Sequence, residues 1–181
     1  MLTNPRKDGF LEAEYEKRQE LLLDNWTFQC KCAHCSAEKE KRDASDKRLS
    51  KIKNLKERLS KNRDKPLRFL KHVRSILDLY EEEEIIMPRG MFAQIGALTA
   101  IEIGDAKLAA EYANIAKRYM SILAGPDSQE VKDMDDLINN PTKHPEWEAK
   151  VEEMEKEEAE EAEKAKKKAA SDKTNEKNET K

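Results

Sequence analysis

The chain contains 181 residues, of which 37% are hydrophobic and 40% are charged, whereas soluble domains average about 45–50% hydrophobic and about 25% charged residues. These proportions exclude a compact α/β enzyme that fills the whole chain. Too few apolar side chains are present to surround one core of that size, so part of the chain must be solvated helix or disordered. The 35 basic and 38 acidic residues leave a net charge of −3, which argues against direct nucleic-acid binding.

The first predicted helix runs from Glu12 to about Asn25, because its residues are good helix formers with apolar side chains near helical spacing. A short β-prone stretch, residues 26–30, follows it. A polar segment then leads to the next helix, for which Ser45 or Asp46 is a suitable N-cap.

In the central part of the chain, amphipathic segments separated by helix-breaking residues predict a series of helices. Pro66 and Pro88 suit the first turn of a helix. Gly104 suits a left-handed position after a helix, Asp105 suits the N-cap of the next one, and Gly125 ends that helix. A shorter amphipathic segment then stops before Pro141. Four tyrosines fall on the apolar faces of these helices and of the first one, and we expect them in the core. They are Tyr15, Tyr80, Tyr112 and Tyr119.

The C-terminal part of the chain consists mostly of Glu, Lys and Ala. Residues 146–170 predict a solvated helix, because alternating charges form i,i+4 pairs worth about 0.2–0.5 kcal/mol each. Residues 171–181 have nothing to bury and are expected to be disordered. The acidic runs Glu81–Glu84 and Glu157–Glu163 are interpreted as solvated helix faces rather than catalytic carboxylates.

The sequence predicts no association with a membrane. No apolar run approaches the roughly 18–20 residues of a membrane span, and the N-terminal residues lack the apolar core of a signal peptide. We therefore expect a reducing compartment, the nucleus or the cytoplasm, in which cysteines seldom form stable disulfides.

The three cysteines form the most informative motif, C-x-C-x-x-C, at Cys30, Cys32 and Cys35. Three thiolates in one tight turn suit a tetrahedral zinc ion, and Lys31 between them favours the thiolate form. A closed structural site needs a fourth ligand. His34 lies inside the loop, where coordination next to Cys35 would be strained, and the alternative is three free thiols without a metal.

The cysteines belong to a longer pattern, which consists of Arg18-x-x-Leu21 and Trp26-x-Phe28-x-Cys30-x-Cys32-x-x-Cys35. This pattern resembles the post-SET segment of SET-domain protein-lysine methyltransferases, above all the fungal SET proteins and the SET-and-MYND group. The resemblance implies that the three cysteines bind one zinc ion whose fourth ligand is a cysteine of an N-H-x-C-x-P-N motif upstream. It also implies that Phe28 packs near the adenine of S-adenosylmethionine.

The resemblance extends from about Thr3 to Ile138, but it is incomplete. The helical region is similar to the TPR-like helices of that family, through Gly104-Asp105 and the small residues that follow. The chain lacks N-H-x-C-x-P-N, the glycine-rich start of a SET domain, a MYND zinc finger and the tyrosine of the methyl-transfer channel. The resemblance therefore implies a C-terminal fragment that is inactive alone.

Four parts are predicted from these observations. Residues 1–36 hold the N-terminal helix and the post-SET-like zinc segment, 37–64 a charged linker and helix, 65–140 a TPR-like helical region, and 141–181 a charged helical to disordered tail. The predicted fold is mainly α, with a short zinc-binding turn followed by an antiparallel helical array.

The expected function is that of a fragment of a histone or other protein-lysine methyltransferase that carries the zinc ligands without the catalytic core. S-adenosylmethionine would bind only in a complete SET domain. The expected partner is a protein, either a histone or another lysine-containing substrate, or a peptide in the helical groove. The alternative function is a zinc-clipped, TPR-like protein-interaction module.

Overall fold

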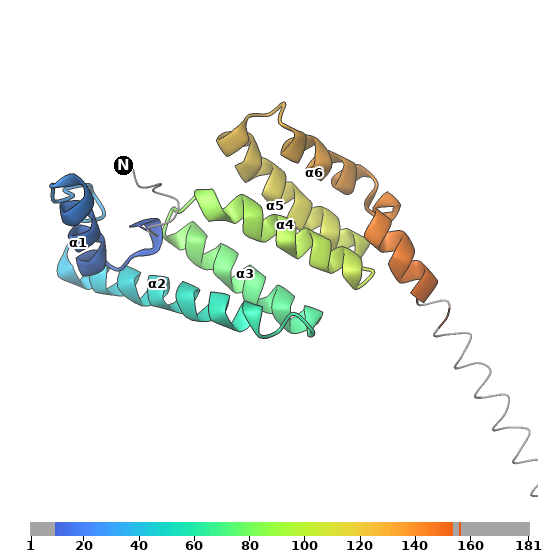
Figure 1. Cartoon of the computed structure of the whole chain (residues 1–181), viewed down its shortest axis with the longest axis horizontal. Helices are drawn as coiled ribbons and strands as arrows, with labels where there is room; N and C mark the ends of the chain where they lie inside the picture. Colours follow the sequence, from blue (N-terminus) through green and yellow to red (C-terminus); the bar gives the residue numbers. More distant parts are fainter. Residues whose placement is uncertain (1–9, 154–155, 157–181) are drawn as a thin grey trace, which may run out of the picture.

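The computed structural model describes residues 10–153 and residue 156. In this part of the chain there are helices and loops but no strands, which confirms the mainly α prediction (Figure 1). Residues 145–153 form a further helical segment. The 3₁₀ helices are η1 (Phe10–Glu12) and η2 (Pro141–Lys143), and the α-helices are α1 (Tyr15–Trp26), α2 (Lys39–Ser60), α3 (Pro66–Glu82), α4 (Met87–Glu102), α5 (Ala106–Ala124) and α6 (Gln129–Asn139).

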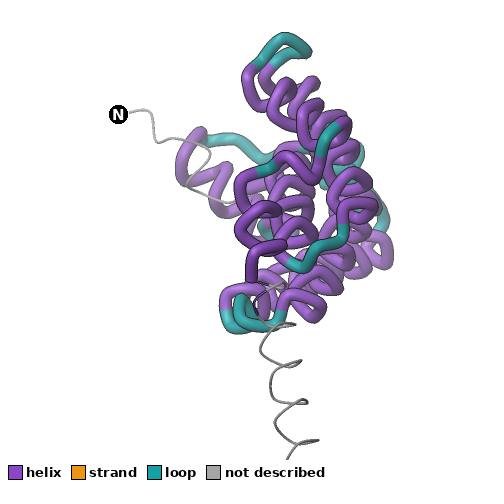
Figure 2. Tube along the Cα trace, turned by 90° about the vertical axis from the view of Figure 1, so that its right-hand side faces the viewer, coloured by secondary structure: helices purple, strands orange, loops and turns teal. Residues whose placement is uncertain are grey.

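Helices α2 to α6 form an array in which each helix packs against its predecessor and runs antiparallel to it (Figure 1). Helix α1 and the cysteine turn lie at the N-terminal end of α2, away from α6. Figure 2 shows the same arrangement from the side, with short loops joining the helices. The array matches the predicted succession of antiparallel helices, while its likeness to TPR helices stays a prediction.

The core lies between α2, α3, α4 and α5. Ile52, Val73, Ile76 and Tyr80 are completely buried, because the apolar faces of α2 and α3 meet there. Helices α4 and α5 approach each other closely through small residues, most tightly at Gly96. A Cβ at that position would lie 2.8 Å from Cδ1 of the Tyr112 ring.

Three of the four tyrosines expected in the core are buried there. Tyr80, Tyr112 and Tyr119 are at most 7% exposed. Tyr15 is only half-buried, and the Arg42 guanidinium lies 4.1 Å from the centre of its ring. Its backbone N–H donates to Asp46 Oδ1 at 2.8 Å, so this end of α1 is attached to α2 largely by polar contacts.

The start of α2 differs from the prediction. The helix begins at Lys39, with Glu38 in an extended conformation before it, whereas Ser45 or Asp46 was the predicted N-cap. Residues 39–44 are mostly good helix formers. The extra turns place Ser45 inside the helix, where its side chain faces the cysteine loop instead of capping a helix end.

Other predicted helix ends are confirmed. Gly104 has φ 75°, the left-handed conformation expected after a helix, and the Asp105 side chain accepts a hydrogen bond from the Leu108 N–H at 2.9 Å. The stretch 26–30 is not a strand, because Thr27 takes a left-handed conformation, φ 56°, immediately after α1.

The tail is described only in part. Residues 145–153 are helical, as predicted for the beginning of the charged segment. The predicted disordered residues, 171–181, lie outside the described residues. Among the helices that the structure describes, none is long and apolar enough to cross a membrane.

Candidate metal centre

The three cysteine sulfurs converge at one point beside α1. The Sγ atoms of Cys30, Cys32 and Cys35 all lie within 4.8 Å of one another. A tetrahedral zinc ion with Zn–S bonds of about 2.3 Å holds its sulfurs about 3.8 Å apart, so a small contraction of the turn would bring all three to bonding distance. The described residues therefore present three thiols at a spacing that suits a zinc ion.

The backbone of the turn supports this convergence. The Ser36 N–H donates to the Cys32 carbonyl at 2.9 Å, closing one turn around the cysteines. The Cys35 N–H is directed at Cys32 Sγ, 3.5 Å away. This backbone hydrogen bond is the main reason that the pKa of Cys32 is lowered to about 7, which favours the thiolate form that binds metals.

Helix α1 holds the turn through the side chain of Gln19. The Gln19 amide pairs with the backbone of Cys30 in both directions, accepting from its N–H at 2.8 Å and donating to its carbonyl at 3.0 Å. The two Gln19 contacts fix the entry to the motif against α1. The neighbouring Arg18 is anchored at its own helix start, where Nη1 donates to the Ala13 carbonyl at 2.9 Å.

Arg18 also determines the electrostatics at Cys35. The Cys35 thiol is buried, and burial raises its pKa, while the adjacent Arg18 guanidinium opposes that shift. Arg18 Nε and Nη2 are buried and have no hydrogen-bond partner. Because a guanidinium can only donate hydrogen bonds, these N–H groups suit a negatively charged sulfur. The donor set and its surroundings thus fit a zinc–thiolate centre.

The structure does not bring a fourth ligand to the sulfurs. No His, Cys, Asp or Glu within the described ranges joins the three cysteines. His34 is directed towards α2, where its Nε2 lies 3.2 Å from Ser45 Oγ. The two other histidines are elsewhere, His72 within α3 and His144 directly after η2. The strained coordination by His34 is therefore not observed.

The hydroxyl of Ser45, which contacts His34, also bonds to a buried acidic side chain, that of Glu83, whose burial the sequence did not predict. The Ser45 hydroxyl donates to Glu83 Oε2 at 2.5 Å, and the other carboxylate oxygen, Oε1, accepts a hydrogen bond from Arg48. The Glu83 side chain is only 2% exposed, so the interpretation of Glu81–Glu84 as a uniformly solvated face is wrong at this position. The carboxylate links the cysteine loop, α2 and the end of α3.

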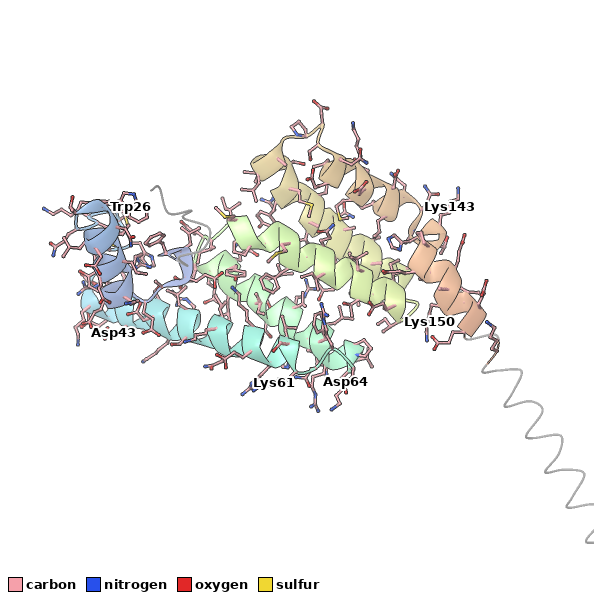
Figure 3. All side chains as sticks on the ribbon, in the orientation of Figure 1. Trp26, Asp43, Lys61, Asp64, Lys143 and Lys150 are labelled. Carbon is pink, nitrogen blue, oxygen red and sulfur yellow. The ribbon has the colours of Figure 1, made fainter. Side chains whose placement is uncertain are left out.

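The aromatic residues before the cysteines are largely accessible. The Trp26 ring packs against Phe10 with the ring centres 4.8 Å apart, at the outer end of α1 in Figure 3. Phe28 is 49% exposed. Its predicted contact with the adenine of S-adenosylmethionine stays a prediction, as does the assignment of the three cysteines as zinc ligands.

Comparison with known proteins supports a distant relationship to SET proteins. No family model matches the chain. The chain is similar to the histone-lysine N-methyltransferase set5 of Schizosaccharomyces pombe, with 28% identity over 140 residues. The similar region covers 74% of this chain but only 43% of that protein, so the chain spans less than half the length of the curated relative that it matches.

Proposed function

We propose that this chain is the zinc-binding C-terminal part of a SET-domain protein-lysine methyltransferase and that it is inactive in methyl transfer on its own. The observation that carries the proposal is the convergence of the Cys30, Cys32 and Cys35 sulfurs without a fourth ligand among the described residues. The distant similarity to a histone-lysine methyltransferase gives independent support.

In this proposal, the chain contributes a preorganised set of three thiolates. Zinc would act as a structural ion that joins the cysteine turn to the segment supplying the fourth ligand. Gln19 holds the backbone of Cys30, and Arg18 places positive charge beside Cys35. The zinc-bound turn would present the exposed Phe28 ring to the SET domain, where S-adenosylmethionine and a histone or other lysine-containing protein would bind.

Zinc binding by the purified full chain tests the first half of the proposal. We expect weak zinc binding, measured by competition with a chromophoric chelator, because three thiolates alone leave the site incomplete, and loss of that binding in Cys30→Ser. His34→Ala is the matched control and should leave the affinity unchanged, because His34 contacts Ser45 instead of the sulfurs. Loss of zinc binding in His34→Ala would contradict the open coordination position.

A methyl-transfer assay tests the second half. With S-adenosylmethionine and histones as substrates, the chain should give no turnover above the buffer background. Methyl transfer requires a channel that aligns the lysine amine with the sulfonium methyl group, and in this proposal that channel belongs to the SET domain outside this chain. Clear turnover that increases with the amount of chain would refute the proposal of an inactive fragment.

A further inference from the structure

A small pocket of about 130 Å³ lies between α3 and α5, beside the first turn of α4. It is remote in sequence from the cysteine turn and has a different chemistry. Three arginines line it, one from each helix, and two acidic residues of α3 lie among them. The polar residues that line the pocket are Arg74, Asp78, Glu81, Arg89, Arg118 and Tyr119.

Arg89 is the unusual member of this group, because its charge is buried without an acidic partner. The residue is 7% exposed. Its Nη1 donates to the Tyr119 hydroxyl, and its guanidinium carbon lies 4.8 Å from the centre of the Tyr119 ring. Nε is buried and has no hydrogen-bond partner. A buried charge is costly unless a counter-charge and hydrogen bonds compensate it, and this guanidinium lacks an anionic acceptor among the described residues.

The two arginines at the rim of the pocket also lack an acidic partner within the described residues, although their side chains are exposed. Arg74 and Arg118 are exposed and stack over tyrosine rings, at 5.9 Å from Tyr112 and 5.8 Å from Tyr119. In the part of the chain that the structure describes, neither of them nor Arg89 forms an ion pair. Three guanidinium groups and the two carboxylates of α3 leave the pocket with one positive charge in excess.

We propose that this pocket binds the carboxylate of a glutamate or aspartate side chain in an acidic peptide segment of a partner protein. The excess charge matches one carboxylate, whereas a phosphate group carries about −1.5 to −2. The planar fork of an arginine also suits a carboxylate, which can accept two parallel hydrogen bonds.

The size of the pocket also indicates a single acidic side chain as the ligand. Ligand pockets for drug-sized molecules measure about 300–1,000 Å³, so a pocket of about 130 Å³ accommodates a single side chain. Leu77 and Ile115 supply apolar surface for its methylene groups. This inference goes beyond the proposed function and does not depend on zinc, since it involves none of the residues of the metal centre.

Nuclear magnetic resonance of the full chain tests the inference at Arg89 directly. The probe is the blocked tetrapeptide acetyl-Gly-Glu-Glu-Gly-amide, and its matched control contains Gln in place of both Glu residues. We expect the Glu peptide to shift the Arg89 Nε–Hε resonance in a saturable manner, and the Gln peptide to leave it in place. Equal shifts from both peptides, or none from either, would overturn the proposal.

Substitutions at the exposed rim test the role of the arginines without disturbing the buried one. Arg118→Gln should weaken binding of the Glu peptide about tenfold, because a charged hydrogen bond is lost, and Asp78→Asn should strengthen it by removing a competing carboxylate. Arg68→Gln, on the same helix as Asp78 but outside the pocket, is the matched control and should leave the affinity for the Glu peptide unchanged. Unchanged affinity in Arg118→Gln would overturn the proposal, as would tighter binding of inorganic phosphate than of the Glu peptide.

Discussion

Removal of the Glu83 carboxylate tests how the cysteine loop is attached to the helical array. Glu83→Ala removes the acceptor shared by the Ser45 hydroxyl and the Arg48 guanidinium, while Arg48 keeps its longer ion pair with Glu82 at 3.5 Å. Loss of one partner from a buried charged pair costs about 3–5 kcal/mol. Because the Arg48 side chain is 31% exposed, solvent compensates part of the loss, and we expect the free energy of unfolding to fall by about 2–3 kcal/mol.

A smaller change is expected from Glu83→Gln, which keeps the shape of the side chain. The amide can still pair with Ser45 and Arg48, but charge-assisted hydrogen bonds become neutral ones, which costs about 1 kcal/mol. Urea denaturation measures both changes through the transition midpoint and slope. Glu84→Gln, at the exposed neighbouring position, is the control and should stay within about 0.5 kcal/mol of the parent. If Glu83→Ala were as mild as this control, the buried network would have no energetic role.

Three further predictions concern the helix contact, the thiols and the support of the metal centre. Gly96→Ala should lower the free energy of unfolding by about 1–2 kcal/mol, because overpacking against the Tyr112 ring exceeds the gain in helix propensity; unchanged or raised stability in urea would contradict the close contact. In the metal-free chain, the rate of Cys32 alkylation by iodoacetamide should be half-maximal near pH 7. Since folding lowers the pKa of Cys32 from 9.0 to about 7, this thiolate stabilises the folded state above pH 9, and the stabilisation is lost as the pH falls towards 7. An alkylation midpoint near pH 9 would contradict the lowered pKa. Gln19→Ala should weaken zinc binding about tenfold in chelator competition, because it releases the backbone of Cys30. An unchanged affinity would contradict a role of these two hydrogen bonds in zinc binding.

Local signals in the sequence were sufficient to predict most helix boundaries. Pro66 begins α3, and Gly104 and Asp105 separate α4 from α5, as expected from their conformational preferences. These features depend on residues a few positions apart, so a single chain reveals them. The C-x-C-x-x-C spacing likewise predicted the convergence of the three sulfurs, because all of them lie in one turn.

Features that depend on distant contacts could not be predicted in this way. Ser45 looked like a helix cap, but it lies inside α2 and bonds to Glu83, 38 residues away. Glu83 looked solvated because its neighbours in sequence are acidic, and its burial depends on Arg48 of another helix. The burial of Arg89 without an acidic partner among the described residues could not be predicted either, since only the packing of α4 against α5 places it against Tyr119. In each case, contacts with residues distant in sequence determine the environment of the side chain, and local sequence patterns do not show such contacts.

The central claim is that Cys30, Cys32 and Cys35 bind zinc while one coordination position stays open to a ligand from outside the described residues. X-ray absorption spectroscopy of the zinc-loaded chain measures this directly. We expect three sulfur atoms at about 2.3 Å from the zinc ion and one solvent oxygen atom at about 2.0 Å from it, without the scattering pattern of an imidazole ring. Four sulfur atoms, or an imidazole signal that disappears in His34→Ala, would contradict it.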